Sequence, residues 1–307
     1  MPSIQQASFS GHETFPFRYT WLKKAVDRVR EEPTVFGLDD AMVRFGVGKN
    51  MVGSIRHWGM VCGVLEEDTE IFNNRGRSLR VSKLGDQLLG TRGWDPYLED
   101  PASLWLLHWQ VANSPERATT WFWVFNHLNR LEFTRDDLVA EMLRLVEQHG
   151  WSRVAENSVK RDVDTFVRSY TAPRVTKKTV VEDTLDCPLV DLGLLGLGSD
   201  GATLTIRRGD HPSLPDEIFA YGLIEFLRLR EHKSSTLSLE ELLFTPGSPG
   251  RVFCLSEAGT LRRLDSLNHL TKGKLTYDET AGLKQVLVLE VPDPLHVLRA
   301  HYRRTKA

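Results

Sequence analysis

Cysteine is scarce in this chain, and a long apolar run is missing. The 307 residues include three cysteines, Cys62, Cys187 and Cys254, which lie far apart among apolar neighbours. That spacing argues against a disulfide framework and a cysteine metal site, and it predicts buried thiols in a reducing, cytoplasmic setting. The sequence shows no basic stretch followed by an apolar run, and no apolar stretch long enough to span a bilayer. We therefore expect no secretion signal and no membrane partner.

The chain also lacks a large excess of either positive or negative charge. The formal net charge is −2, so any nucleic-acid binding must come from local patches and not from a global field. The sequence also lacks a Walker loop, a dinucleotide glycine fingerprint, a paired-cysteine motif and a His-Glu-x-x-His metal helix. These absences exclude several common enzyme classes, and they leave the function to be inferred from local clusters of residues.

Residues 39–91 carry the pattern of a winged helix-turn-helix. Asp39 is a candidate N-cap, and Gly46-Val47-Gly48 would end the first helix because glycine accepts a positive φ. A second helix is predicted over Lys49 to Cys62, where apolar residues recur near helical spacing. A recognition helix offers side chains near its leading end to base edges. The candidates there are Lys49, Asn50, Ser54 and Arg56.

A hairpin is predicted after this helix. A strand would begin at Val64-Leu65, and the hairpin would include Ile71-Phe72 and Leu79 to Val81, with its turn at Asn74-Arg75-Gly76. Arg75 and Arg77 would then lie where a wing meets DNA phosphates. Winged helices also serve as protein-binding modules, and four acidic residues between Glu66 and Glu70 dilute the positive field, so that alternative stays open.

A shift in composition divides the chain. All eight tryptophans lie between Trp21 and Trp151, whereas residues 174–202 contain no aromatic residue and gain glycine and aspartate. We expect this stretch to be the least tightly packed connection, where limited proteolysis would cut first. The predicted fold class is α+β and mostly helical. The predicted segments are a tryptophan-rich winged-helix plus helical domain at 1–173, a connector at 174–202 and a smaller winged-helix-like domain at 203–307.

The C-terminal segment repeats the helix and strand order of a winged helix. Ser238 and Glu241 form a capping box for a short helix, and Ser256 to Leu267 would be the recognition-type helix. Wing strands are predicted at Leu275 to Glu279 and Gln285 to Val291. A last helix begins at Asp293-Pro294, and its end is rich in arginine, including Arg299 and Arg303. Helix C-termini favour cations, so a dipole effect accounts for part of that pattern.

Two polar clusters are candidates for chemistry. In the arm Gly11 to Arg18, His12 would act as a base, Glu13 as a metal ligand and Arg18 as a phosphate clamp. The alternative is an extended arm that packs its phenylalanines on the domain. In the block Lys160 to Asp164, two carboxylates stand beside two cations, which is a donor set for a divalent metal and a phosphate.

The second cluster also has a plainer interpretation, a solvated helix face with paired charges. We predict a joint site in which Glu13 and Asp164 hold Mg²⁺ or Mn²⁺ and Asp162 assists. Lys160 and Arg161 would clamp the phosphate, and the arm must meet this helix in space. A third group of residues, from Trp105 to His127, would be a base-stacking surface or, as helical spacing favours, core. His108 on its apolar helix is predicted to be a buried, hydrogen-bonded histidine.

Several long blocks resemble a bacterial family that was long known only as a domain of unknown function. They include Phe9 to Arg18, Val47 to Val52, Gly93 to Pro101, Leu104 to Trp109 and Lys160 to Asp164. The resemblance covers nearly the whole chain and is strongest before Thr171. Members are similar to the SspB-type component of DNA phosphorothioation, in which sulfur replaces a non-bridging phosphate oxygen of DNA.

The resemblance implies a DNA-nicking endonuclease that depends on a divalent metal and acts on double-stranded DNA. The implied partners are a cysteine desulfurase, an ATPase and a phosphosulfate-reductase-like enzyme, all sulfur-modification proteins. The alternative from another class is a non-enzymatic winged-helix regulator or a recruitment factor for the sulfur-inserting enzymes. The oligomeric state, a homodimer included, stays open. The resemblance does not supply catalytic residues, so the candidates above rest on residue chemistry alone.

Overall fold

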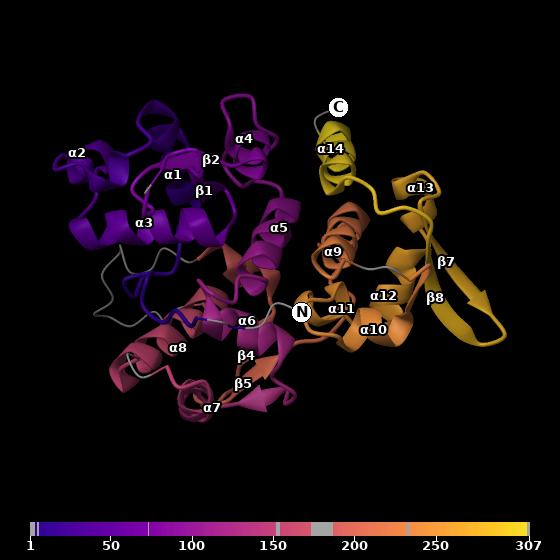
Figure 1. Cartoon of the computed structure of the whole chain (residues 1–307). Coiled ribbons are helices and arrows are strands. Elements are labelled where there is room, and N and C mark those ends of the chain that lie inside the picture. The colour runs from indigo at the N-terminus through magenta and orange to yellow at the C-terminus, as the bar shows by residue number, and fades with distance from the viewer. Residues whose placement is uncertain are drawn as a thin grey trace.

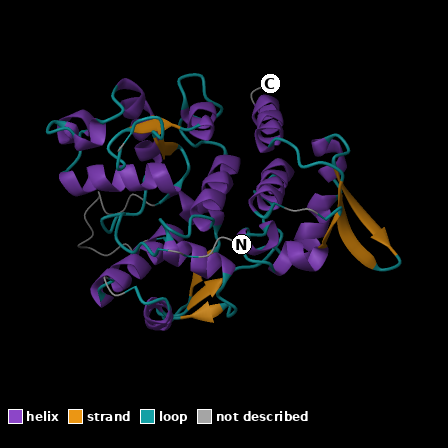
Figure 2. Cartoon of the chain, viewed as in Figure 1, coloured by secondary structure: helices purple, strands orange, loops and turns teal. Residues whose placement is uncertain are grey.

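A computed structural model describes residue 4 and residues 6–72, 74–151, 154–172, 187–231 and 234–305. The fold is α+β and mostly helical, with small antiparallel sheets, one of them among the N-terminal helices and one projecting on the C-terminal side (Figure 2). Figure 1 shows helices α1 to α4 gathered on one side, α6 to α8 below them, and α9 to α14 on the other side. Helix α5 runs between these groups, and it packs on α6 and α9.

The first group contains the predicted helix, turn and helix. Gly46 takes the left-handed conformation with φ 64°, which ends α2, and the next helix begins at Lys49. The side chain of Ser82 caps α4 by accepting a hydrogen bond from the amide of Gly85. The elements are α1 Tyr19–Glu31, η1 Val35–Gly37, α2 Ala41–Phe45, α3 Lys49–Val61, β1 Leu65–Glu67, β2 Leu79–Val81 and α4 Lys83–Leu89.

The hairpin contains the strand predicted to begin at Val64-Leu65, but it differs from the prediction at Ile71-Phe72. β1 pairs with β2 in an antiparallel register that sets Leu65 opposite Val81, whereas Ile71 and Phe72 lie exposed in the connection. The turn falls where it was expected, because Arg75 and Gly76 both have positive φ. Ile71-Phe72 has strand propensity, but the described residues offer it no partner strand or core face.

The middle of the chain is built on buried aromatic helices. α5 is buried on nearly all sides, as its all-round apolar sequence predicts, and Asp100 caps it with Pro101 at its first position. Thr134 and Asp137 form a reciprocal capping box at α7. The elements are α5 Pro101–Ala112, α6 Thr119–Asn126, β3 Glu132–Phe133, α7 Arg135–Gln148 and α8 Glu156–Tyr170.

The predicted connector is only partly described, because residues 174–186 lie outside the described residues. The described part begins with η3 Pro188–Leu192 and continues into β4 Leu195–Leu197 and β5 Leu204–Ile206. η3 contacts α5 and α8, and β5 pairs with both β4 and β3 in one sheet. This tight packing differs from the loose connection that composition suggested, since leucines replace aromatics as core residues here. The three-segment division stays a prediction.

The last group ends in a helix that returns to the first half. The capping box of Ser238 and Glu241 is present, and β6, β8 and β7 form an antiparallel sheet in that order. Helix α14 packs on α9, and the hydroxyl of its Tyr302 lies 2.9 Å from that of Ser103 in α5. The elements are α9 Asp216–Leu229, β6 Thr236–Ser238, α10 Leu239–Phe244, α11 Pro249–Val252, α12 Glu257–Leu264, α13 Leu267–Thr271, β7 Leu275–Thr280, β8 Leu283–Val288 and α14 Pro294–Thr305.

The tryptophan cluster forms core. Trp105, Trp109 and Trp121 are buried, and so is His108. His108 Nε2 donates to the carbonyl of Val252 at 2.8 Å, and its Nδ1 accepts the hydroxyl of Tyr170 at 2.8 Å. The prediction of a hydrogen-bonded core histidine is therefore confirmed, and burial lowers its pKa to about 4. Within the described residues, no helix is both long and apolar enough to cross a membrane.

Candidate nucleic-acid interface

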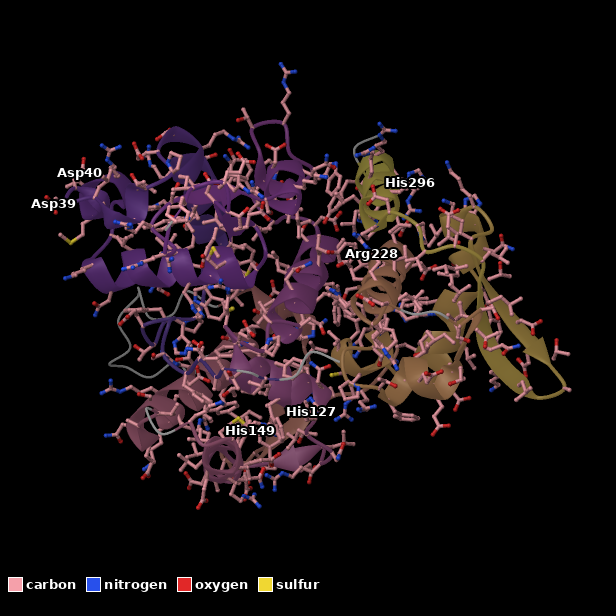
Figure 3. All side chains as sticks on the ribbon, viewed as in Figure 1. Asp39, Asp40, His127, His149, Arg228 and His296 are labelled. Atoms are coloured by element: carbon pink, nitrogen blue, oxygen red, sulfur yellow. The ribbon has the colours of Figure 1, made fainter. Side chains whose placement is uncertain are left out.

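An open groove of about 520 Å³ borders the leading end of α3. Its walls come from η1, the start of α2, the first turns of α3 and Glu13 of the N-terminal arm. Lys49 and Asn50 lie exposed at its rim, and among the described residues their side chains have no hydrogen-bond or ion-pair partner. Asp39 also lines the groove and lies at the outer edge of the molecule (Figure 3). The groove therefore combines cations, an amide and two carboxylates.

The arm reaches this groove through a strained turn. Glu13 and Thr14 both have positive φ, 49° and 67°, which is costly for residues that carry a Cβ. Three contacts hold the turn: the amide of Glu13 bonds to the carbonyl of Ser10, that of Phe15 to the carbonyl of His12, and Arg168 of α8 donates to the carbonyl of Thr14. The turn leaves Glu13 exposed beside Gly53, where a Cβ would lie 3.5 Å from Glu13 Cγ.

The imidazole of His12 anchors the turn from inside. Its Nδ1 accepts the amide of Thr14 at 3.0 Å, so the ring proton is assigned to Nε2, which donates to Oδ1 of Asp162 at 2.7 Å. Both side chains are buried, with 2 % of His12 and 1 % of Asp162 exposed. The arm thus meets α8. Because both ring nitrogens are already bonded to protein, His12 holds the turn and has no free nitrogen for a substrate proton.

Residues of α3 complete this junction. Trp58 Nε1 donates to the carbonyl of Phe15 at 2.8 Å, and a Cβ on Gly11 would come within 2.3 Å of His57 Nδ1. Glycine is therefore required at position 11 for the arm to lie this close to α3. Burial lowers the pKa of His57 to about 3, and the neighbouring His12 adds to the shift. The helix that borders the groove, the arm and α8 consequently pack as one unit.

The two aspartates of α8 face in different directions. Positions two apart on a helix are about 200° apart, so Asp162 points inward to His12 while Asp164 is exposed and pairs with Arg135 at 3.5 Å. Lys160 pairs with Glu156 at 2.5 Å, and Arg161 is exposed. In the described part of the chain no three His, Cys, Asp or Glu side chains are placed to hold a metal. The structure brings His12 and Asp162 together, but it shows no such cluster around Glu13 and Asp164.

The arginines predicted to contact DNA in α3, the wing and the arm differ in how they are used. Arg56 is half-buried and donates to the carbonyl of Gly76 at 2.9 Å, so it fastens the wing turn to α3. Arg75 is exposed, and Arg77 is exposed while its Nε bonds to the carbonyl of Asn74. Arg18 lies over the ring of Trp21, 5.4 Å from its centroid. Ser54, expected among the polar groups, is instead buried against the arm.

Comparison with known proteins identifies the family of the chain. A family model described as a protein of unknown function, DUF4007, matches residues 9–302. The chain belongs to this family. A crystal structure titled magnesium ion-bound SspB is 32 % identical, with a TM-score of 0.88 over 99 % of this chain and 91 % of that one. A second SspB crystal structure is 30 % identical, with a TM-score of 0.86 and the same coverage. No functionally curated protein matches the chain.

Within this DUF4007 member, sequence reasoning missed two residues of the candidate interface. Phe72 in the wing connection is 91 % exposed, next to Arg75 and Arg77, and was expected to lie in a strand. Asp39 was expected only to cap a helix, yet it lines the groove with Glu13. Its position 26 residues after Glu13 gave no signal of that neighbourhood, whereas the strand propensity of Ile71-Phe72 suggested a strand at Phe72.

Proposed function

We propose that the chain binds double-stranded DNA through α3 and the hairpin after it, acting as a winged helix-turn-helix, and that it nicks DNA in a phosphorothioation system. The observation that carries the proposal is the placement of Glu13. A strained and heavily anchored turn sets this carboxylate beside Lys49 and Asn50 at the leading end of α3. Strain of this kind is retained where it serves a function. The full-length similarity to SspB structures supports the system assignment.

A magnesium ion fits the groove better than it fits the α8 surface. Mg²⁺ commonly takes one or two carboxylates, keeps several waters and binds substrate phosphate. Glu13 and Asp39 line one groove with Asn50, and these oxygens match that donor set. Such an ion would polarise a DNA phosphate and stabilise charge that develops on it. Asp164 is outside this proposal because it faces away from Asp162 and pairs with Arg135.

The chain's own residues have distinct tasks in this scheme. Lys49 at the rim of the groove and Arg75 at the wing turn neutralise phosphates, and Asn50 is placed to contact a base edge. His12 and Asp162 are positioning residues, since they hold the turn from which Glu13 extends. Lys160 and Arg161 lie on the exposed face of α8, where they would contact a continuing DNA backbone.

A supercoiled-plasmid assay tests the proposal. The wild-type chain, with and without the sulfur-modification proteins, is incubated with Mg²⁺, Mn²⁺ or a chelator, and open-circular DNA is measured. We expect metal-dependent nicking that falls at least 100-fold in Glu13→Gln and falls less than threefold in Asp164→Asn. Equal activity of wild type and Glu13→Gln would overturn the role of the groove carboxylate.

The alternative is a DNA-binding recruitment factor with no activity of its own. It is favoured by the finding that the described residues contain no group of three metal-binding side chains. It predicts that purified chain binds DNA without nicking under any metal condition, and that the desulfurase, the ATPase or the phosphosulfate-reductase-like enzyme co-purifies with it. Nicking by the purified chain alone, lost in Glu13→Gln, would rule this alternative out.

A further inference from the structure

Three open hollows outside the α3 groove adjoin one another through shared lining residues, and together they are called the channel below. The first lies along α1, the second lies between α1, the end of α4 and α14, and the third lies between α13 and α14. The first and second share Arg30 and Thr91, and the second and third share Arg299. The channel therefore runs from the N-terminal group across to the C-terminal group. His296 in the third hollow and Asp39 in the α3 groove lie on opposite sides of the molecule (Figure 3).

The channel is strongly cationic although the chain as a whole is slightly acidic. Among the described residues that line it, nine are lysine or arginine and four are aspartate or glutamate. The carboxylates are already used: Asp27, Glu31 and Asp86 each pair with a cation of the channel wall. The fourth, Asp293, accepts the amide of Leu295 at the start of α14. Lys274 also pairs with Glu290, and these carboxylates leave part of the positive excess of the channel without an ion-pair partner among the described residues.

Three guanidinium groups line the central hollow of the channel. Arg92, Arg299 and Arg303 line the same hollow of about 450 Å³, all are exposed, and none has an ion-pair or hydrogen-bond partner among the described residues. Arg299 and Arg303 are four residues apart on one face of α14, where like charges repel. The dipole of α14 favours cations near its end, but it does not account for Arg92 and Arg30, which reach this hollow from other elements.

The walls of the central hollow are fixed relative to one another. Trp94 lines the hollow and stacks on Tyr302 of α14 with ring centroids 5.1 Å apart, and the hydroxyl of Tyr302 lies 2.9 Å from that of Ser103. His301, next to Tyr302, lies 2.9 Å from a carboxylate oxygen of Asp100. These contacts hold α14 against the segment that leads into α5, so the arginines from both halves of the chain keep their spacing. A preformed row of cations suits a polyanion of regular charge spacing.

We infer that this channel binds the phosphate backbone of DNA, at a segment separate from the one that contacts α3. The ligand chemistry is a row of phosphodiesters, because unpaired arginines along a groove supply the backbone contacts that sequence-independent binding uses. The inference rests on the proposed function only in taking DNA as the ligand, and it needs no nicking activity. With both surfaces engaged, the protein would hold a longer or bent stretch of duplex.

The test compares two double variants with the same loss of charge. Arg92→Ala with Arg303→Ala removes two cations of the channel, while Arg130→Ala with Arg144→Ala removes two exposed cations near α7, at the other end of the molecule in Figure 1. Binding to a fluorescent duplex of about 40 base pairs is measured by anisotropy at several salt concentrations. Each lost phosphate contact lowers the slope of log affinity against log salt by about 0.9.

We expect the channel variant to lose at least tenfold in affinity at about 100 mM salt, and its slope to fall by about 1.8. The control variant should change less than threefold, and both should melt at the wild-type temperature. Equal affinity and slope in the two variants would overturn the inference. So would loss of binding to poly-glutamate with unchanged DNA affinity, which would assign the channel to an acidic protein. Because Glu13→Gln leaves the channel intact, nicking that is absent in wild type or unchanged in Glu13→Gln, together with channel-dependent DNA binding, would count against the proposed function alone.

Discussion

The helices α3 and α12 fall in the two segments predicted to contain recognition-type helices, yet their polar side chains are used in opposite ways. α3 begins with Lys49 and Asn50, which are exposed and have no partner among the described residues. α12 begins with Glu257, which pairs with Lys284 of the neighbouring hairpin at 2.9 Å. The leading end of α3 is therefore available to a ligand, and that of α12 is occupied by the protein itself.

Arginines show the same contrast. Arg263 of α12 is only 1 % exposed and donates to the carbonyls of Gly259, Asp210, His211 and Leu214 at 2.7 to 3.0 Å. In the first half Arg75 is exposed at the wing turn. A helix predicted to be of the recognition type thus does not decide function by itself. What differs is whether the cations satisfy buried carbonyls or face the solvent.

The largest expected effect is a loss of stability when the buried hydrogen bonds of Arg263 are removed. Arg263→Ala leaves several buried carbonyls without a donor and should destabilise the fold by about 3 kcal/mol or more. For a chain of this length that corresponds to a fall in Tm of about 5 °C, measured by differential scanning fluorimetry. Arg262→Ala, on the exposed side of the same helix, is the control and should change Tm by less than about 1 °C. Equal shifts would show that the buried network carries no special stability.

A smaller loss of stability is expected when the hydrogen bond between the N-terminal arm and α8 is removed. Asp162→Ala removes the acceptor of His12 Nε2 and leaves a buried donor unpaired, which should cost about 1–3 kcal/mol and loosen the arm. Asp162→Asn keeps an acceptor oxygen at the same place and should retain most of the stability. Thermal unfolding measures both, and nicking assays report whether the loosened arm still presents Glu13. An unchanged Tm in Asp162→Ala would mean that the arm is not held by this bond.

DNA-binding affinity tests whether exposed cations of the first half contribute more than paired cations of the second half. Lys49→Ala with Arg75→Ala should reduce affinity about tenfold or more and lower the salt slope by about 1.8. Arg262→Ala with Lys284→Ala removes the same charge from the second half and should leave affinity within about threefold, because those cations are already paired. Anisotropy titrations over a range of salt decide this. A stronger effect from the second pair would reverse the assignment of the two halves.

The smallest effect concerns the junction between the halves. Burial lowers the pKa of His301, but the carboxylates of Asp100 and Glu217 outweigh it and raise the pKa to about 9. The unfolded value is about 6.5, so the stabilisation is fully present below that pH and is lost as the pH rises through about 9. We expect Tm to fall more steeply between about pH 6.5 and 9 in wild type than in His301→Gln. Parallel profiles of Tm against pH in wild type and His301→Gln would show that this histidine contributes no pH-dependent stability.

Local patterns predicted much of the architecture. The positive φ of Gly46, the capping boxes at Thr134 and Ser238 and the all-round burial of α5 follow from rules that act over a few residues. The place of Ile71-Phe72 could not be predicted in this way, because strand formation needs a partner and propensity does not provide one. The candidate site was also only partly predictable. The arm and the Lys160 block were both singled out, yet their spacing in sequence gives no information about which carboxylate faces which.

The sequence by itself determined the mostly helical fold, the ends of its main helices and the short blocks where polar chemistry concentrates, since capping, turns and amphipathic periodicity are local. Only the tertiary structure decided that Asp162 is buried under His12 while Glu13 faces the α3 groove, and that Arg263 is internal while Arg92 and Arg303 share an exposed channel. Those outcomes depend on residues that are far apart in sequence, about 50 positions for the carbonyls around Arg263 and 150 for His12 and Asp162. The charge on a side chain is fixed by its type, but its use depends on what the fold places beside it.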